Sequence, residues 1–290
     1  MGEHRGFWVL TPPISRVSST MGKAQYLTGV VMMVRRIDAH VHGKAPNCSA
    51  EAAQYVEKYR ALGIDKIVLI ESPGTVLRAM ETCGDFIIPV FRVDPDTVTE
   101  QEIRDYFHMG CRGIKFIAPL HAYSDSRYLP LYKTIAAHDG VAVFHTGYLT
   151  HRDYRIYTHV NLFDMAPAHL DHIARQIPHL KMLMSHYGNP WWNEAWKVSY
   201  SHENIYADLS GGTAYICSLS MWKELFAPNG KLHTESVRKL CFASDIVYFR
   251  ESLNVEPYFE FHDTLLEQIG ASQELIQRIN YDNIADLFSL

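Results

Sequence analysis

Two histidines, His40 and His42, lie two residues apart at the end of an apolar run that begins at Ile37. On a β-strand, residues i and i+2 point to the same face, so both imidazoles can bind one ion from a single strand. A strand holds such a site more rigidly than a loop does. The pair alone is a weak indication, but three later strand-like runs also end in residues that bind metals, namely His145, His186 and Asp245. We therefore interpret these five residues as one predicted site.

Imidazole and carboxylate ligands are typical of Zn²⁺, and they also suit Mn²⁺, Fe²⁺ or Co²⁺. His40, His42, His145 and Asp245 would surround one divalent ion and leave room for a water molecule. The ion would lower the pKa of that water from about 15.7 to about 7. Asp245 would also accept a proton from the water, and His186 would hold the water or protonate a leaving group. The alternatives for His186 are a fifth ligand, or a hydrogen-bonding partner that orients another ligand.

Bringing these residues together requires strands whose ends meet, and the chain alternates strand-like and helix-like segments from residue 36 onward. The strand-like runs, mostly aliphatic as in strands buried on both faces, are Ile37–Val41, Lys66–Ile70, Ile87–Val93, Gly113–Ile117, Val141–His145, Lys181–His186, Ile205–Leu209 and Leu240–Ser244. Among the helix-like segments, Thr99 with Glu102 three residues later predicts a capping box. The pattern predicts an α/β fold, a (β/α)8 TIM barrel with the metal site at the C-terminal ends of the strands. The alternative is an open doubly wound sheet.

Three charged residues, which lie in or just after the second, third and fourth predicted strands, are further candidates for the predicted site. Lys115 lies within the fourth strand, where a buried lysine needs a charged partner or a ligand. Arg92 near the end of the third strand would bind a substrate carboxylate, or pair with Asp94. Glu71 follows the second strand, either as an acceptor for a ligand histidine or as a loop carboxylate.

The loop after the fifth strand, residues 146–163, is long, and long loops at this face often shape a substrate pocket. Its arginines and tyrosines indicate an anionic, aromatic substrate; a solvated loop or a subunit contact is the alternative. Trp191 would form a wall of the pocket, or pack on the barrel. The predicted substrate-binding residues are therefore Lys115, Arg92, Arg152, Tyr148 and Trp191.

The composition fits a globular enzyme that binds a small molecule. The chain has 290 residues, 47% hydrophobic and 20% charged, with a net charge of −5 and no basic stripe, so we expect no nucleic-acid partner. No apolar run approaches the roughly 18 residues of a membrane span, so we expect no membrane partner. Five cysteines without C-x-x-C spacing are typical of reduced thiols in a cytoplasmic protein.

Two regions are expected. Residues 1–34 are predicted to be an N-terminal extension, disordered or upstream of the true start at Met32 or Met33; an ordered extra strand is the alternative. Residues 35–290 are predicted to form the barrel.

The motifs at the strand ends resemble those of the amidohydrolase superfamily. They read Ile-Asp-Ala-His-Val-His, Arg-Gly-Ile-Lys-Phe, Val-Phe-His-Thr-Gly, Leu-Met-Ser-His-Tyr-Gly and Phe-Ala-Ser-Asp, in that order. They are most similar to the amidohydrolase-related branch that includes aminocarboxymuconate-semialdehyde decarboxylase. The resemblance covers Arg36 to Leu290 and implies that His40, His42, His145 and Asp245 bind metal and that His186 is catalytic. In other branches the lysine at the position of Lys115 is carbamylated; here we expect an unmodified cation. A homodimer is also implied.

The motifs are specific for the superfamily but not for a reaction. Our leading hypothesis is a metal-dependent hydrolase that acts on a small, anionic ester, lactone or amide through a metal-activated water. The alternative is a non-oxidative, metal-dependent decarboxylase of a small aromatic or unsaturated carboxylic acid. A barrel that only binds a ligand is a third reading, which the intact set of five strand-end residues disfavours.

Overall fold

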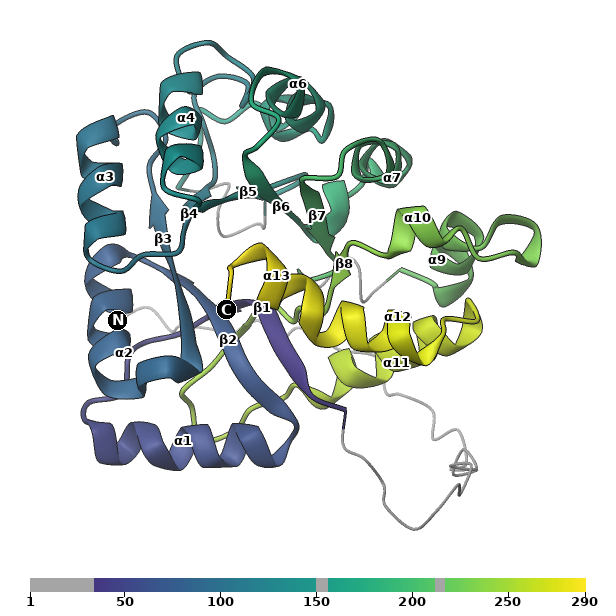
Figure 1. Cartoon of the computed structure of the whole chain (residues 1–290), viewed down its shortest axis with the longest axis horizontal. Helices are drawn as coiled ribbons and strands as arrows, with labels where there is room; N and C mark the ends of the chain where they lie inside the picture. The colour runs from purple at the N-terminus through teal and green to yellow at the C-terminus, as the bar shows by residue number, and fades with distance from the viewer. Residues whose placement is uncertain (1–33, 150–155, 212–216) are drawn as a thin grey trace, which may run out of the picture. The chain divides into compact units, whose positions relative to one another are not determined.

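The computed structural model describes residues 34–149, 156–211 and 217–290. The chain divides into two units, Met1–Met33 and Val34–Leu290. The second unit is the body coloured in Figure 1. The predicted extension, residues 1–34, lies outside the described residues except for Val34.

The second unit is built on a sheet of nine parallel strands (Figure 1). The strands are β1 Arg36–His42, β2 Ile64–Glu71, β3 Ile87–Val93, β4 Gly113–Phe116, β5 Val141–His145, β6 Lys181–Ser185, β7 Ile205–Asp208, β8 Leu240–Cys241 and β9 Ile246–Val247. Each strand from β1 to β7 pairs with the next one in the chain, and β9 pairs with β1. The predicted (β/α)8 barrel is confirmed, and the open doubly wound sheet is not formed.

The eighth strand differs from the prediction, which was one run over Leu240–Ser244. It is split into β8, which pairs with β7, and β9, which pairs with β1. Between them the Ala39 amide donates to the Phe242 carbonyl at 2.9 Å, and the Asp245 amide donates to the His40 carbonyl at 2.8 Å. Because β8 pairs with β7 and β9 pairs with β1, the split strand closes the barrel. The segment between β8 and β9 places Asp245 beside the end of β1.

Helices alternate with the strands. They are α1 Ser49–Ala61, α2 Pro73–Cys83, α3 Glu100–His108, α4 Leu129–Ala137, α6 Ala168–Gln176, α7 Trp192–Ser201, α9 Leu219–Phe226, α10 Thr234–Val237, α11 Glu256–Gln268, α12 Gln273–Gln277 and α13 Asn283–Leu287. The capping box predicted at Thr99 is present at the start of α3. Helix α2 was not predicted; its opening Pro73-Gly74 looks like a turn in sequence, but proline is favoured in the first turn of a helix.

Two hydrophobic clusters fill the barrel unit. The larger joins the helices to the outer faces of the strands. The smaller contains Ile37, Ala39, Val68, Ile70, Ile88, Val90, Val141, Val143, Leu183, Cys241 and Ala243 from the strands, with Ile284, Leu287 and Phe288 from the C-terminal segment. Phe288 lies beside Gly113, the first residue of β4. The C-terminal segment therefore covers the N-terminal ends of the strands, and the opposite ends are left to the polar residues.

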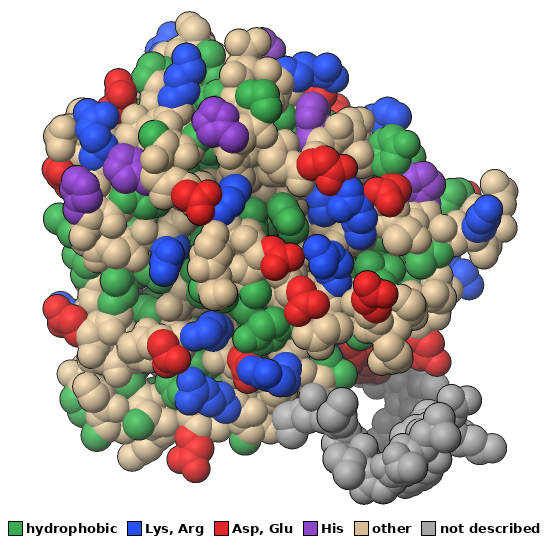
Figure 2. Space-filling view, in the orientation of Figure 1, with side chains coloured by type: hydrophobic (Ala, Val, Ile, Leu, Met, Phe, Trp, Pro, Cys, Tyr) green, Lys and Arg blue, Asp and Glu red, His purple; other side chains and the backbone are tan. Residues whose placement is uncertain are grey.

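On the face shown in Figure 2, acidic and basic side chains are interspersed. All five cysteines are free thiols. Among the described residues, no helix combines the length and the apolar character that crossing a bilayer requires.

Candidate metal centre

A bulge in β1 sets the direction of its histidines. Asp38 pairs with Ile67 and Val41 with Leu69, so three steps along β1 face two along β2. Without this extra residue, Ile37, Ala39 and Val41 would share a face, yet Val41 packs in the outer cluster and the other two pack inside. Asp38 bonds to Ser244 and Tyr248, and Tyr248 belongs to the outer cluster. The bulge therefore turns the Asp38 carboxylate toward Ser244 and Tyr248 and away from the imidazole rings of His40 and His42.

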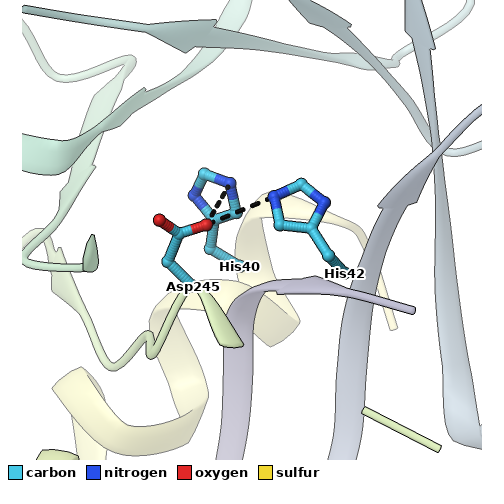
Figure 3. A group of neighbouring side chains, drawn as sticks. All are labelled: His40, His42 and Asp245. Carbon is cyan, nitrogen blue, oxygen red and sulfur yellow. Dashed lines mark ion pairs between the residues drawn. The ribbon is translucent and has the colours of Figure 1, made fainter. Parts of the chain in front are cut away.

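His40, His42 and Asp245 converge at the C-terminal ends of the strands, as predicted. The Nε2 atoms of His40 and His42 lie 3.6 and 3.2 Å from the same oxygen, Oδ1 of Asp245. Figure 3 shows both rings and the carboxylate directed toward one another. One ligand atom from each residue lies within 4.8 Å of the others. This spacing suits three side chains that share one cation.

Hydrogen bonds on the far sides of the rings favour this use of Nε2. The Nδ1 atom of His42 lies 2.7 Å from the Ile70 carbonyl, which can only accept, so Nδ1 carries the proton. The Nδ1 atom of His40 lies 3.4 Å from Oδ2 of Asp208, another acceptor. Metal-binding histidines commonly donate their second N–H in this way. The nitrogen and oxygen donors therefore fit a divalent cation of the kind that imidazole and carboxylate bind.

The pKa values are consistent with a place for a cation. Burial lowers the pKa of His40 to about 3, so its imidazole is neutral and can act as a ligand. Burial also disfavours the charge of His42, but hydrogen bonds with Asp245 and Glu71 outweigh it and raise the pKa of His42 to about 9. Burial by itself would raise the pKa of Asp245. The neighbouring rings of His40, His42 and His186 lower this pKa by a larger amount, so the carboxylate is ionised. A metal ion would replace the proton that the carboxylates hold on His42.

His186 and Asp245 do not continue their strands. β6 ends at Ser185, one residue short of the predicted end, and His186 begins a turn with φ of 65°. Asp245 has φ of 61°. The ring centroids of His186 and His40 lie 4.9 Å apart. Burial lowers the pKa of His186, which keeps its ring neutral beside the cluster.

His145 lies at the end of β5 as predicted, but it is outside the three-residue cluster among the described residues. Its ring centroid lies 4.6 Å from that of His186. Its Nε2 lies 3.3 Å from the Tyr148 carbonyl, to which it donates. Burial lowers the pKa of His145 well below its usual value, so the ring is neutral. The structure thus brings together three of the four predicted ligands, and the role of His145 stays a prediction.

Asp208 and Ser210 belong to the site but were not among the predicted residues. Asp208 ends β7 and is fully buried, and Ser210 is 1% exposed. Ser210 Oγ lies 3.2 Å from His40 Nδ1 and 3.0 Å from His186 Nδ1. A metal-binding side chain at the C-terminal end of an aliphatic strand is the signal that could have identified Asp208, as it identified His145.

Lys115 and Arg92 lie on the adjacent strands β4 and β3. Lys115 is 2% exposed, and its Nζ donates to Ser185 Oγ at 2.7 Å. Burial lowers the pKa of Lys115 to about 8. Glu71 lies between the site and Arg92, with one oxygen 3.7 Å from His42 Nδ1 and the other 3.6 Å from the Arg92 guanidinium. Glu71 is therefore an acidic neighbour of His42, whose Nδ1 proton is donated to the Ile70 carbonyl.

A cavity of about 290 Å³ adjoins Arg92. It is lined by Ser72, Arg92, Val93, Asp94, Ile117, Ala118, Tyr157 and His159. In the segments after β5 and β6, the rings of Tyr148 and Trp191 lie 5.8 Å apart, and Phe163 lies 5.6 Å from Trp191. Tyr148 is 48% exposed, so part of this aromatic group faces solvent. Arg152 lies outside the described residues.

Comparison with known proteins adds a family and a set of similar folds. A family model described as Amidohydrolase matches residues 37–290. An uncharacterised TIM-barrel protein from Bordetella bronchiseptica has a TM-score of 0.64 and 16% identity, over 88% of this chain and 99% of its own. A dihydroxybenzoic acid decarboxylase from Polaromonas sp. JS666, with bound manganese and the inhibitor 2-nitroresorcinol, has a TM-score of 0.58 and 14% identity, over 89% and 98%.

A probable 2-pyrone-4,6-dicarboxylic acid hydrolase from Acinetobacter baumannii, with citric acid bound, has a TM-score of 0.57 and 14% identity, over 88% and 100%. No curated protein matches the sequence. At these identities the similar structures establish the fold and leave the reaction open.

Proposed function

The chain belongs to the amidohydrolase family, and on that premise we propose that it is a metal-dependent, non-oxidative decarboxylase of a small aromatic or unsaturated carboxylic acid. The observation that carries the proposal is the convergence of His40 Nε2, His42 Nε2 and Asp245 Oδ1 at the open rim of the barrel. Two cationic side chains, Lys115 and Arg92, are paired across the neighbouring strands β4 and β3 of the same barrel.

His40, His42 and Asp245 would hold one divalent ion, and we propose His145 as a further ligand. For this, His145 would use Nδ1, or its Nε2 would release the Tyr148 carbonyl. A bound ion would supply a positive charge that holds and polarises the oxygen atoms of the substrate. The donor set suits Zn²⁺ and also Mn²⁺, and the decarboxylase from Polaromonas carries manganese.

The side chains around the site fit an anionic, flat substrate. Arg92 is partly exposed, and the cavity beside it also has Tyr157 and His159 in its lining, so a carboxylate there would meet a guanidinium and two further hydrogen-bond donors. The aromatic group formed by Tyr148, Trp191 and Phe163, after β5 and β6, offers ring faces to a flat substrate.

In the proposed reaction the bond between the substrate carbon and its carboxylate breaks, and carbon dioxide leaves. The electron pair stays on the substrate carbon, which then takes one proton, so no oxidant is required. Asp245, a member of the cluster, and His186, whose ring lies 4.9 Å from that of His40, are the titratable groups placed to carry that proton. Lys115 would stabilise the negative charge that develops before protonation.

Hydrolysis is the second candidate. From the sequence we expected it first, and the hydrolase from Acinetobacter baumannii has a similar fold. Decarboxylases recur among the similar structures, including enzymes for 2,6-dihydroxybenzoate and 5-carboxyvanillate. This recurrence favours the loss of carbon dioxide over the attack of water on an ester, lactone or amide.

An assay of products separates the two reactions. The purified protein is loaded with Zn²⁺ or Mn²⁺ and given hydroxybenzoic acids and unsaturated dicarboxylic acids, each labelled in the carboxyl carbon, and in parallel lactones and esters of the same size. Labelled carbon dioxide with an equal amount of decarboxylated product supports the proposal. Turnover of lactones or esters alone overturns it in favour of hydrolysis, and a protein that neither binds metal nor turns over any substrate contradicts both readings.

A further inference from the structure

A serine hydroxyl lies among three side chains at the candidate site. Ser210 Oγ is 2.5 Å from Asp208 Oδ1, 3.0 Å from His186 Nδ1 and 3.2 Å from His40 Nδ1. Ser210 and Asp208 are buried, so water does not compete for these bonds. The hydroxyl therefore connects a proposed metal ligand, His40, to the proposed catalytic residue, His186.

The same neighbourhood has the spacing of a second cation site. Ligand atoms of His40, His186 and Asp208 all lie within 4.8 Å of one another. A cation among them would need all three at about 2.0–2.2 Å. The hydroxyl of Ser210 already lies within hydrogen-bonding distance of each one. The cluster is therefore a hydrogen-bonded network, and the cation belongs on the Nε2 side of His40.

The protons of this network can be counted. Asp208 Oδ1 accepts the backbone N–H of His186 at 2.9 Å and that of Ser210 at 3.0 Å, so it also accepts the one proton of the Ser210 hydroxyl. The two lone pairs of that hydroxyl are then free to accept from His40 and His186. The second neighbour of His186 Nδ1 is the Ser210 carbonyl at 3.2 Å, which can only accept. Both rings therefore carry a proton on Nδ1.

We propose that Ser210 and Asp208 are a positioning pair that holds His40 and His186 in the tautomer with the proton on Nδ1. This leaves both Nε2 atoms with a lone pair, one for the metal ion and one for the reaction. The pair touches neither substrate nor ion and acts through the two rings. The inference rests on the proposed function for the roles of the rings, but the tautomers themselves can be measured independently.

Imidazole nitrogen NMR of the purified protein tests the proposal, with and without a chelator. Long-range proton–nitrogen couplings tell which ring nitrogen carries the proton, and the signals are assigned by comparison with His40→Gln and His186→Asn. We expect Nδ1–H for both rings in the wild type. Nε2–H at His186 in the folded wild-type protein would overturn the proposal without any variant of the pair.

Two variants separate the members of the pair. In Ser210→Ala, His186 loses an acceptor, and we expect a mixture of tautomers, with kcat about tenfold to a hundredfold lower. In Asp208→Asn, the oxygen stays with the backbone N–H groups, so the amide nitrogen faces His40 Nδ1. Because that nitrogen donates, we expect His40 to move its proton to Nε2 and the protein to lose affinity for Zn²⁺ in a competition titration.

Ser210→Thr keeps the hydroxyl and serves as the rescue control, with the tautomers of the wild type. Unchanged tautomers in folded Ser210→Ala and Asp208→Asn would overturn the proposal. The tautomers can be as expected in a protein that releases no carbon dioxide; in that case the proposed function fails and the positioning role stands. If the tautomers are wrong in a protein that does release carbon dioxide, the positioning role alone fails.

Discussion

His186 and Asp245 approach the same point beside Gly211. A Cβ atom at position 211 would lie 3.1 Å from His186 Nδ1 and 3.1 Å from Asp245 Oδ2. Both residues also have left-handed backbone conformations, with φ of 65° and 61°. Such conformations are costly for residues other than glycine and persist where the surrounding structure holds them, often at functional sites. Gly211 therefore leaves the space that these two side chains need.

Gly211→Ala should impair the site more than the fold. The new methyl group would crowd both side chains, and small misplacements of catalytic groups can cost about a hundredfold in rate. We expect kcat to fall at least about tenfold. Gly270→Ala is the matched control, because Gly270 has a similar φ of 72° against 83° and no atom within 4 Å of its Cβ position. Both variants should lose about 1–2 kcal/mol of stability; an equal loss of activity in both would contradict the role of Gly211.

His42→Ala should release the metal ion. Its Nε2 faces Asp245 while its Nδ1 is held by the Ile70 carbonyl, so the ring is preorganised as a ligand. We expect metal content after dialysis, measured by elemental analysis, to fall far below one ion per chain. His108→Ala, at an exposed position on α3, should keep the ion. His145→Ala tests whether His145 is a metal ligand. A loss of metal content like that of His42→Ala would make His145 a ligand, whereas an unchanged metal content would show that it is not one.

His186→Asn should separate metal binding from turnover. His186 packs against the rings of His40 and His145, but it is not in the group formed by His40, His42 and Asp245. We expect turnover to be abolished while the metal content stays near that of the wild type. If the variant also loses the ion, His186 is a metal ligand and not the catalytic residue that we propose.

Arg92→Met should weaken substrate binding with little effect on stability. The Arg92 side chain is 42% exposed and its contact with Glu71 is at 3.6 Å, so its ion pair contributes little to the fold. A hydrogen bond to a charged group is worth about 1.5–3 kcal/mol, so we expect KM for a carboxylate substrate to rise tenfold or more. Arg104→Met is the control, with a side chain 40% exposed on α3. Equal KM values in the two variants would remove Arg92 from the substrate site.

His262 should make the barrel sensitive to acid. It is 2% exposed, and its Nε2 has no hydrogen-bond partner among the described residues. Burial, with the charge of Arg36, lowers the pKa of His262 to about 4, whereas an unfolded histidine has a pKa of about 6.5. Between these values the unfolded chain binds a proton that the folded chain does not. The free energy of unfolding should therefore fall by about 2 kcal/mol from pH 7 to pH 5 on account of this residue.

His262→Phe removes this group and keeps a ring beside Phe242. Urea unfolding at pH 7 and pH 5 should show a smaller loss of stability in the variant than in the wild type. Other titrating groups are common to both proteins and cancel in the comparison. An identical loss in the two proteins would show that His262 is not buried as a neutral ring.

Much of this protein could be read from single residues and their spacing. The aliphatic strands and the capping box at Thr99 are local features of the sequence. The rule that barrel sites form at the C-terminal ends of strands was enough to predict that His40, His42 and Asp245 lie together. The family followed from the same motifs, and the matching family model covers residues 37–290.

Other features depend on contacts between distant segments, which spacing does not encode. The bulge in β1 depends on its register with β2, and the split eighth strand depends on pairing with both β7 and β1. The end of β7 marks Asp208 as a candidate, but only the fold shows that its carboxylate lies against Nδ1 of His40. The sequence by itself therefore determined that His40, His42 and Asp245 lie together, because each lies at the C-terminal end of a strand-like run. The tertiary structure alone decided which atom each side chain presents, because hydrogen bonds from neighbouring strands orient the rings.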